Sequence, residues 1–208
     1  MRSFVGLLFA GLSAFGQPIN PFAVTQVSRH LDAPNHTASE SSFLFAMNRD
    51  GSIVSVDLDP TSGGTRQIID PVKHQTLLVN PNSRTAVVMP YGGRPQSGSE
   101  DACEQRFRNM TGAIVSVDRS AGMIQGVPMQ RISVNLPEMG TSMEMLVAPS
   151  LACHMMDART FRHGVLVNSQ TAENLQLGDP EPHLFEVPAD YQVTNAALSF
   201  AACPCIQK

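Results

Sequence analysis

The stretch of residues 65–90 constrains the fold most strongly, because it predicts three short strands joined by two polar turns. The first turn is expected at residues 70–74 (DPVKH) and the second at residues 80–83 (NPNS). Proline presets φ at a turn, and Asp, Asn and Ser side chains hydrogen-bond their own backbone, so both breaks have a physical cause. The stretch therefore predicts an antiparallel meander, which is a scaffold and contains no obvious catalytic residue.

Glycine and proline support the same fold class along the rest of the chain. There are 15 of each, and they interrupt the sequence every few residues, which argues against long helices and for many short strands. Residues 131–136 alternate cleanly between apolar and polar side chains, as expected for a half-buried strand. An Asn-Arg-Asp-Gly sequence at 48–51 predicts a hairpin turn. Residues 31–42 are polar and predict a loop, residues 103–108 predict a helical turn, and residues 186–193 predict a final strand.

The first 16 residues have the pattern of a signal peptide. Arg2 precedes an apolar run at residues 4–12, and the small residues Ala14 and Gly16 fit a cleavage site. The run is too short to span a bilayer, and no later stretch is long and apolar enough. The alternative for this segment is a buried N-terminal helix. We expect a cleaved signal peptide at 1–16, followed by one β-rich domain at 17–208 with a mobile N-terminal leader.

The charge balance argues against nucleic acid as a partner. The chain has 14 Lys and Arg against 18 Asp and Glu, and removal of Arg2 with the signal peptide leaves 13 − 18 = −5. There is no basic stripe that could follow a phosphate backbone. We therefore expect an exported protein, periplasmic or extracellular, with no nucleic-acid partner and no transmembrane segment.

Four cysteines, Cys103, Cys153, Cys203 and Cys205, are candidates for disulfide bonds in such a compartment. Four cysteines allow three connectivities. A bridge between Cys203 and Cys205 would close a very small, strained ring. The remaining alternatives are a Cys103–Cys153 bridge or a bridge from either of these residues to the C-terminal pair. A long loop closed in this way would stabilise the fold by roughly 4 kcal/mol.

Methionines cluster in the second half of the chain, around the sequence Cys153-His154-Met155-Met156. Thiolate and thioether groups are ligands for Cu(I), but on a strand alternate residues point to opposite faces, so no single face collects the whole set. Methionine also fills irregular or lipid-adapting cavities. We therefore expect no metal and no cofactor. The expected lining of an apolar ligand cavity is Met143, Met145, Val147 and Met155.

Two stretches carry a resemblance to a known family. The first stretch is residues 64–86, which contain GTRQIIDP (64–71) and LLVNPNSRTA (77–86), and the second is the C-terminal motif GDPEPHLFEVPADYQV at 178–193. Together they resemble an uncharacterised family of exported bacterial β-rich proteins. That family is similar to periplasmic lipoprotein carriers and outer-membrane lipoprotein-sorting proteins. The resemblance implies a strongly curved, incomplete antiparallel barrel with few short helices, whose apolar cavity receives acyl chains. This chain departs from the pattern where Met145-Leu146-Val147 replaces the usual aromatic residue, and it has no long amphipathic helix to act as a lid.

The function that follows is a non-catalytic binding module with an acyl chain or another apolar ligand on the concave face of the sheet. The sequence contains no G-x-S-x-G, H-E-x-x-H or phosphate-loop motif, and its six histidines are scattered. The main alternative is a structural or interaction protein of the cell envelope with a filled core and no ligand. A metal or redox protein built on Cys153, His154 and the C-terminal cysteines is the third hypothesis.

Overall fold

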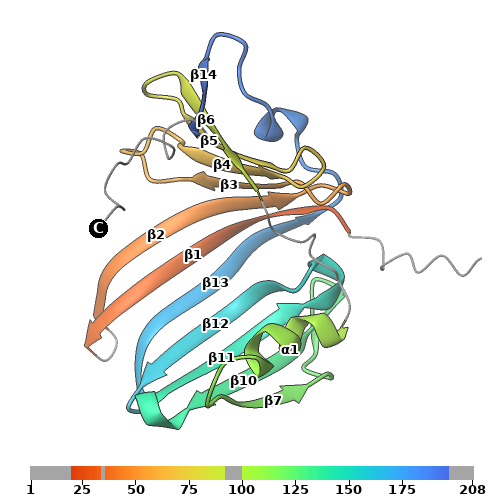
Figure 1. The fold of residues 1–208 in the computed structure, drawn as a ribbon. Coiled ribbons are helices and arrows are strands. Elements are labelled where there is room, and N and C mark those ends of the chain that lie inside the picture. Colours follow the sequence, from red (N-terminus) through yellow and green to blue (C-terminus); the bar gives the residue numbers. More distant parts are fainter. Residues whose placement is uncertain (1–19, 34–35, 92–99, 197–208) are drawn as a thin grey trace, which may run out of the picture.

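A single twelve-stranded sheet forms the body of the protein. In the computed structural model, residues 20–33, 36–91 and 100–196 are described. The strand order is β14-β6-β5-β4-β3-β2-β1-β13-β12-β11-β10-β7, and every neighbouring pair is antiparallel except β14 and β6. The long central strands curve across the molecule (Figure 1). The predicted fold class, a curved antiparallel sheet with few short helices, is therefore confirmed.

The elements have the following bounds: β1 (Phe22–Ala33), β2 (His36–Met47), β3 (Ile53–Asp57), β4 (Arg66–Asp70), β5 (Gln75–Asn80), β6 (Thr85–Pro90), α1 (Glu100–Arg108), β7 (Ile114–Asp118), β8 (Met123–Ile124), β9 (Val127–Pro128), β10 (Gln130–Leu136), η1 (Pro137–Met139), β11 (Thr141–Ala148), η2 (Pro149–Leu151), β12 (His154–Arg162), β13 (Val165–Leu177), η3 (Pro182–Phe185) and β14 (Gln192–Asn195). The strands β8 and β9 form a separate two-stranded hairpin.

The meander predicted from residues 65–90 is present as β4, β5 and β6. Both predicted turns form as expected: Asp70 Oδ1 accepts hydrogen bonds from the backbone N–H groups of Val72 and Lys73, and Asn80 Oδ1 accepts one from Ser83. The Asn48–Gly51 hairpin between β2 and β3 is also confirmed, with the Gly51 N–H donating to the Asn48 carbonyl.

Two sequence expectations were wrong. The predicted loop at 31–42 is instead the far end of β1 and the start of β2, which pair as far as Ala33 and His36. These residues are polar because the ends of both strands are exposed, and an ion pair between Arg29 and Glu40 (2.7 Å) joins them across the ladder. The predicted final strand at 186–193 is irregular for most of its length, and β14 begins only at Gln192.

Two short helical elements cover opposite faces of the sheet at its opposite ends. Through the strand register, the side chains packed against α1 belong to one face, which we call the α1 face. The side chains packed against η3 and the segment after it belong to the other face. The α1 cluster contains Ile132, Val134, Met145 and Val147, and the η3 cluster contains Ala46, Val54, Ile68, Val79 and Ala86.

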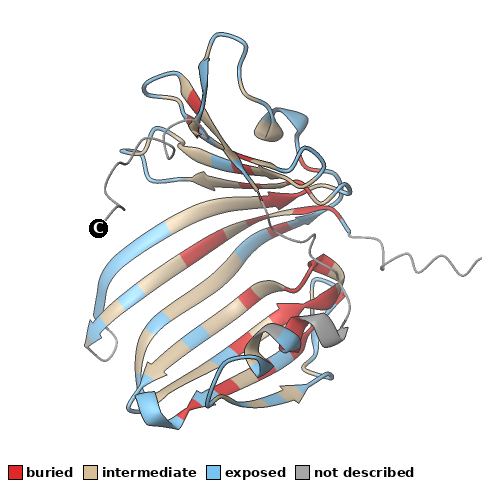
Figure 2. Cartoon of the chain, viewed as in Figure 1, coloured by how far each residue is buried: buried red, intermediate tan, exposed pale blue. Residues whose placement is uncertain are grey.

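A third cluster of buried residues lies between these two ends of the sheet. Phe22 and Met47, on the α1 face of β1 and β2, pack with Val127 and Met129 from the β8–β9 region and with Leu151 from η2. Figure 2 shows the buried positions gathered beneath α1 and toward one end of β1 and β2, whereas the other end of these two strands is exposed.

The predicted signal peptide and most of the leader lie outside the described residues, as do Cys203 and Cys205. Within the described ranges, no helix has both the length and the apolar character needed to cross a membrane.

Candidate functional site

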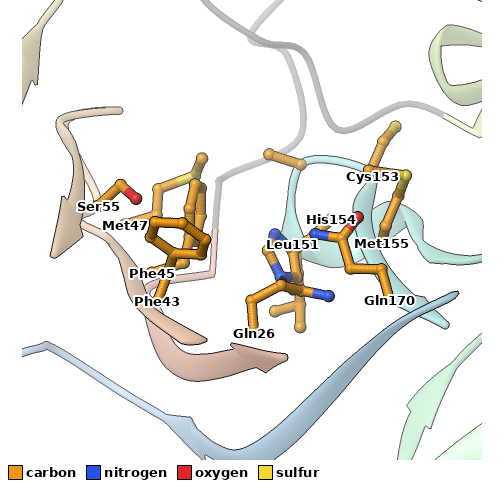
Figure 3. Close-up of a pocket in the computed structure, with 11 residues that line it drawn as sticks. Gln26, Phe43, Phe45, Met47, Ser55, Leu151, Cys153, His154, Met155 and Gln170 are labelled. Atoms are coloured by element: carbon orange, nitrogen blue, oxygen red, sulfur yellow. Dashed lines mark hydrogen bonds between the residues drawn. The ribbon is translucent and has the colours of Figure 1, made fainter. Parts of the chain in front are cut away.

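A half-open pocket of about 240 Å³ lies on the α1 face, between β2 and the turn that enters β12. Figure 3 shows its side chains, with the Phe43, Phe45 and Met47 group facing Leu151, His154 and Met155. The lining residues are Gln26, Phe43, Phe45, Met47, Ser55, Leu151, Ala152, Cys153, His154, Met155 and Gln170.

The apolar wall follows from the period of β2. Phe43, Phe45 and Met47 alternate along this strand and so share one face, while Leu44 and Ala46 point to the other. Cross-strand pairing places Phe43 opposite Gln26 on β1 and opposite Asp57 on β3, and it places Phe45 opposite Ser55. The pattern therefore delivers two aromatic rings and a thioether to one side of the pocket.

A strained turn delivers the opposite wall. Ala152 and Cys153 have φ values of +53° and +60°, a left-handed conformation that non-glycine residues seldom adopt. The turn follows η2 and leads directly into β12, so His154 and Met155 enter the pocket at the start of that strand. A disulfide from Cys153 to Cys103 holds the turn against α1.

His154 lies against two aromatic rings. Its ring centroid is 4.6 Å from that of Phe45 and 5.1 Å from that of Phe22, and the two phenyl rings stack at 5.8 Å. Burial among these rings lowers the pKa of His154 to about 4, because the charged imidazolium would lose its hydration. The histidine is therefore neutral near pH 7.

One neutral hydrogen bond joins the two walls. His154 Nε2 lies 3.0 Å from Gln26 Oε1, and the neutral ring donates its Nε2–H to that oxygen. Gln26 is 4% exposed, and its Nε2 has no hydrogen-bond partner among the described residues. The described lining of the pocket includes no Lys, Arg, Asp or Glu.

The four residues predicted to line a cavity lie together, but only one reaches this pocket. Met143, Met145, Val147 and Met155 all belong to the cluster beneath α1. Met155 also lines the pocket, while Met145 and Val147 are buried in the packed interior. Alternation along β11 places Met143, Met145 and Val147 on one face, yet it could not show that α1 packs over them.

The cysteine chemistry is also resolved in part. Cys103 pairs with Cys153, one of the connectivities that the sequence left open. This bridge removes Cys153 as a thiolate ligand for a metal. In the part of the chain that the structure describes, no three His, Cys, Asp or Glu residues lie close enough together to hold a metal ion.

Sequence reasoning missed the aromatic wall and its glutamine. The signal for the wall was present, because Phe43, Phe45 and Met47 occupy alternate positions of a predicted strand and so share a face. Nothing in the sequence marked Gln26, because its role depends on the pairing of β1 with β2 and on the distant His154.

No family model matches the chain, and comparison with curated proteins finds no significant sequence match. Comparison with solved structures does find similar chains. An uncharacterised conserved protein from Thermus thermophilus is similar over 85% of this chain and 90% of its own, with 11% identity and a TM-score of 0.51. MucB, in a complex with MucA(peri), aligns over 84% of this chain and 57% of its own, with 16% identity and a TM-score of 0.48. A LolA superfamily protein from Nitrosomonas europaea aligns over 81% and 91%, with 11% identity and a TM-score of 0.36.

Proposed function

We propose that this protein is an exported, non-catalytic binding module that holds an apolar ligand, such as an acyl chain, in the pocket on the α1 face. The observation that supports this most directly is the pocket itself. Its walls are largely apolar, and binding would be favoured because they remove a ligand's apolar surface from water. The apolar wall residues are Phe43, Phe45, Met47, Leu151 and Met155.

A binding role fits the chemistry of the pocket better than a catalytic one. Ser55 and His154 both line it, but the orienting partner of His154 is the neutral amide of Gln26. A general base works best with a pKa near the operating pH, whereas burial lowers the pKa of His154 to about 4. A histidine with so low a pKa would be a weak base near pH 7 and would activate a serine poorly.

Export is proposed from the leader and the disulfide together. The first 16 residues have the signal-peptide pattern, and the Cys103–Cys153 bridge fits an oxidising compartment such as the periplasm or the extracellular space.

The test is binding by the mature chain, purified from a host compartment that forms disulfides. Native mass spectrometry would detect co-purified lipid, and a fluorescent fatty-acid methyl ester would be titrated to obtain an affinity. Phe43→Ser should weaken binding about tenfold, because it removes roughly half of a buried phenyl contact, about 1.4 kcal/mol. Leu44→Ser is the matched control, since Leu44 is equally half-buried on the same strand but faces away from the pocket.

A structural or interaction protein without a ligand is the second candidate. The pocket volume of about 240 Å³ favours it, because ligand pockets generally occupy about 300–1,000 Å³. Absence of both co-purified lipid and saturable probe binding would favour this candidate and would contradict the first.

A further inference from the structure

Among the described residues that line the pocket, Gln26 has a buried side-chain polar atom without a hydrogen-bond partner. Gln26 lies on β1 between the aromatic wall and the His154 wall, and Figure 3 shows it beside Leu151 and His154 at the base of the labelled group. Its Oε1 accepts from His154, while its Nε2, buried with the rest of the side chain, donates to no described residue. A buried donor without an acceptor is costly and uncommon in a folded protein.

An incoming ligand could remove this cost by presenting an acceptor. A carbonyl oxygen is a pure acceptor. Once the Gln26 side chain rotates to turn its enclosed Nε2 toward the pocket, that oxygen can accept a hydrogen bond from the Nε2–H while the aliphatic chain contacts Phe45, Met47 and Leu151. A plain hydrocarbon would contact the same apolar side chains but would leave the Gln26 Nε2–H without an acceptor.

The absence of charged side chains from the described lining of the pocket further limits the chemical class of the ligand. Its described lining contains no Lys or Arg, and the neutral His154 supplies no positive charge. A carboxylate buried here would lose its hydration without gaining a counter-charge, which is strongly unfavourable. A ketone, ester or amide carbonyl avoids this penalty.

We propose that the pocket selects aliphatic ligands that carry a neutral carbonyl group, whose oxygen accepts a hydrogen bond from Gln26 Nε2. This inference rests on the proposed function, since it assigns the chemical class of ligand to the same pocket. The pocket has room for about eight water-sized groups and is half-open, so a nine-carbon ligand would fill it with its carbonyl group and most of its chain while the last carbon atoms extend past the opening.

Three probes of equal chain length test the proposal by displacement of a fluorescent fatty-acid methyl ester from the mature protein at pH 8: 2-nonanone, nonane and nonanoate. Each is measured against the wild type, Gln26→Met, and the pair Gln26→Met with His154→Phe. The double variant removes both members of the hydrogen bond, so neither is left unpaired if the single variant folds poorly. Gln176→Met is the matched control, because Gln176 is exposed on β13 and does not line the pocket.

We expect Gln26→Met to weaken 2-nonanone about tenfold relative to its effect on nonane, and nonanoate to bind the wild type at least tenfold more weakly than 2-nonanone. The Gln176 control should leave the ketone-to-alkane ratio as in the wild type. In the wild type, 2-nonanone should also shift one side-chain amide pair in a ¹⁵N spectrum, and that pair should be missing in Gln26→Met.

Equal weakening of ketone and alkane in both Gln26 variants, or preferential binding of nonanoate, would overturn the carbonyl assignment while leaving the binding function intact. Failure of all three probes to displace the fluorescent methyl ester would overturn the carbonyl assignment, and failure of the ester itself to bind would overturn the binding function as well.

Discussion

At the scale of single residues, His154 both lines the pocket and affects the stability of the fold. Its ring lies between Phe22 and Phe45, and its hydrogen-bond partner is the neutral Gln26. Such an environment tolerates the neutral imidazole and disfavours the imidazolium. Because nothing in the described lining of the pocket can compensate a positive charge, the histidine makes folding sensitive to acid.

The free energy of unfolding should therefore fall as the pH is lowered from about 6.5 towards 4. The folded pKa of His154 is lowered to about 4, whereas the unfolded ring titrates near 6.5, so between these values protons bind preferentially to the unfolded chain. The contribution is complete above pH 6.5, and about 3 kcal/mol of it is lost by pH 4. Urea unfolding at a series of pH values would measure this loss.

Two glutamine substitutions identify the residue responsible. His154→Gln keeps a polar side chain but cannot titrate, so its unfolding free energy should fall less steeply than that of the wild type over the same range. His30→Gln, at an exposed position of β1, should follow the wild-type curve. The same slope in all three proteins would show that His154 does not contribute to the pH dependence.

Residue patterns predicted well which face of the sheet a side chain lies on, and predicted poorly how deeply it is buried. The alternation along β10 placed Ile132, Val134 and Leu136 inside, as the structure shows. Met145 and Val147, which were expected from the sequence to line a cavity, are buried in the cluster beneath α1. Burial depends on which element covers a face, and that is decided by contacts distant in sequence.

At the scale of elements, α1 depends on a covalent link. It is nine residues long, and a helix this short is marginal without tertiary contacts. Cys103, which is fully buried, ties it to the strained turn at Cys153, and Phe107 packs on the same cluster. The disulfide therefore holds α1 against the α1 face. It also fixes the turn from which His154 and Met155 of β12 reach the pocket.

Removal of the bridge by Cys103→Ala with Cys153→Ala should lower the free energy of unfolding by about 4 kcal/mol, because the bridged residues are 50 apart in sequence. Urea unfolding followed by far-UV circular dichroism would measure this loss. Wild-type protein that has been unfolded, reduced and alkylated serves as the comparison, since it lacks the bridge with its native sequence. A loss below about 1 kcal/mol in the double variant would show that noncovalent packing alone holds α1 in place.

The two stretches that the sequence singled out prove to be structural partners. Arg66 on β4 donates from its guanidinium to the backbone carbonyl of Glu186 (2.5 Å), and Phe185 and Tyr191 pack on the η3 cluster. β14 then adds to β6 in parallel. Composition and turn chemistry predicted the meander, whereas this docking could not be predicted because it joins segments about 120 residues apart.

At the scale of the whole molecule, the sheet is continuous although its two ends have separate cores. The α1 cluster and the η3 cluster lie on opposite faces, and the cluster around Phe22 lies between them. Local patterns predicted many of the strands, but not that β1 would sit at the centre of the sheet between β2 and β13. A central strand with neighbours on both sides should make the two ends unfold together.

The tyrosines allow this cooperativity to be tested. The chain has two tyrosines and no tryptophan, and both tyrosines lie at the β6 end of the sheet: Tyr191 packs on the η3 cluster, and Tyr91 follows β6. Tyrosine fluorescence therefore reports on one end, while far-UV circular dichroism reports on the whole sheet. For a single cooperative unit, the two signals should give coincident urea transitions.

Phe22→Ala should displace both transitions together to lower urea and cost about 4 kcal/mol, because Phe22 is fully buried in the central cluster and its truncation leaves a cavity beside Phe45 and His154. Val193→Ala, at an exposed position of β14, should change the free energy of unfolding by less than about 0.5 kcal/mol. If Phe22→Ala instead separated the two signals, with tyrosine fluorescence keeping its wild-type midpoint, the η3 end would be stable without the centre. The sheet would then be two folding units joined at β1, even though its hydrogen-bond ladder runs unbroken from β14 to β7.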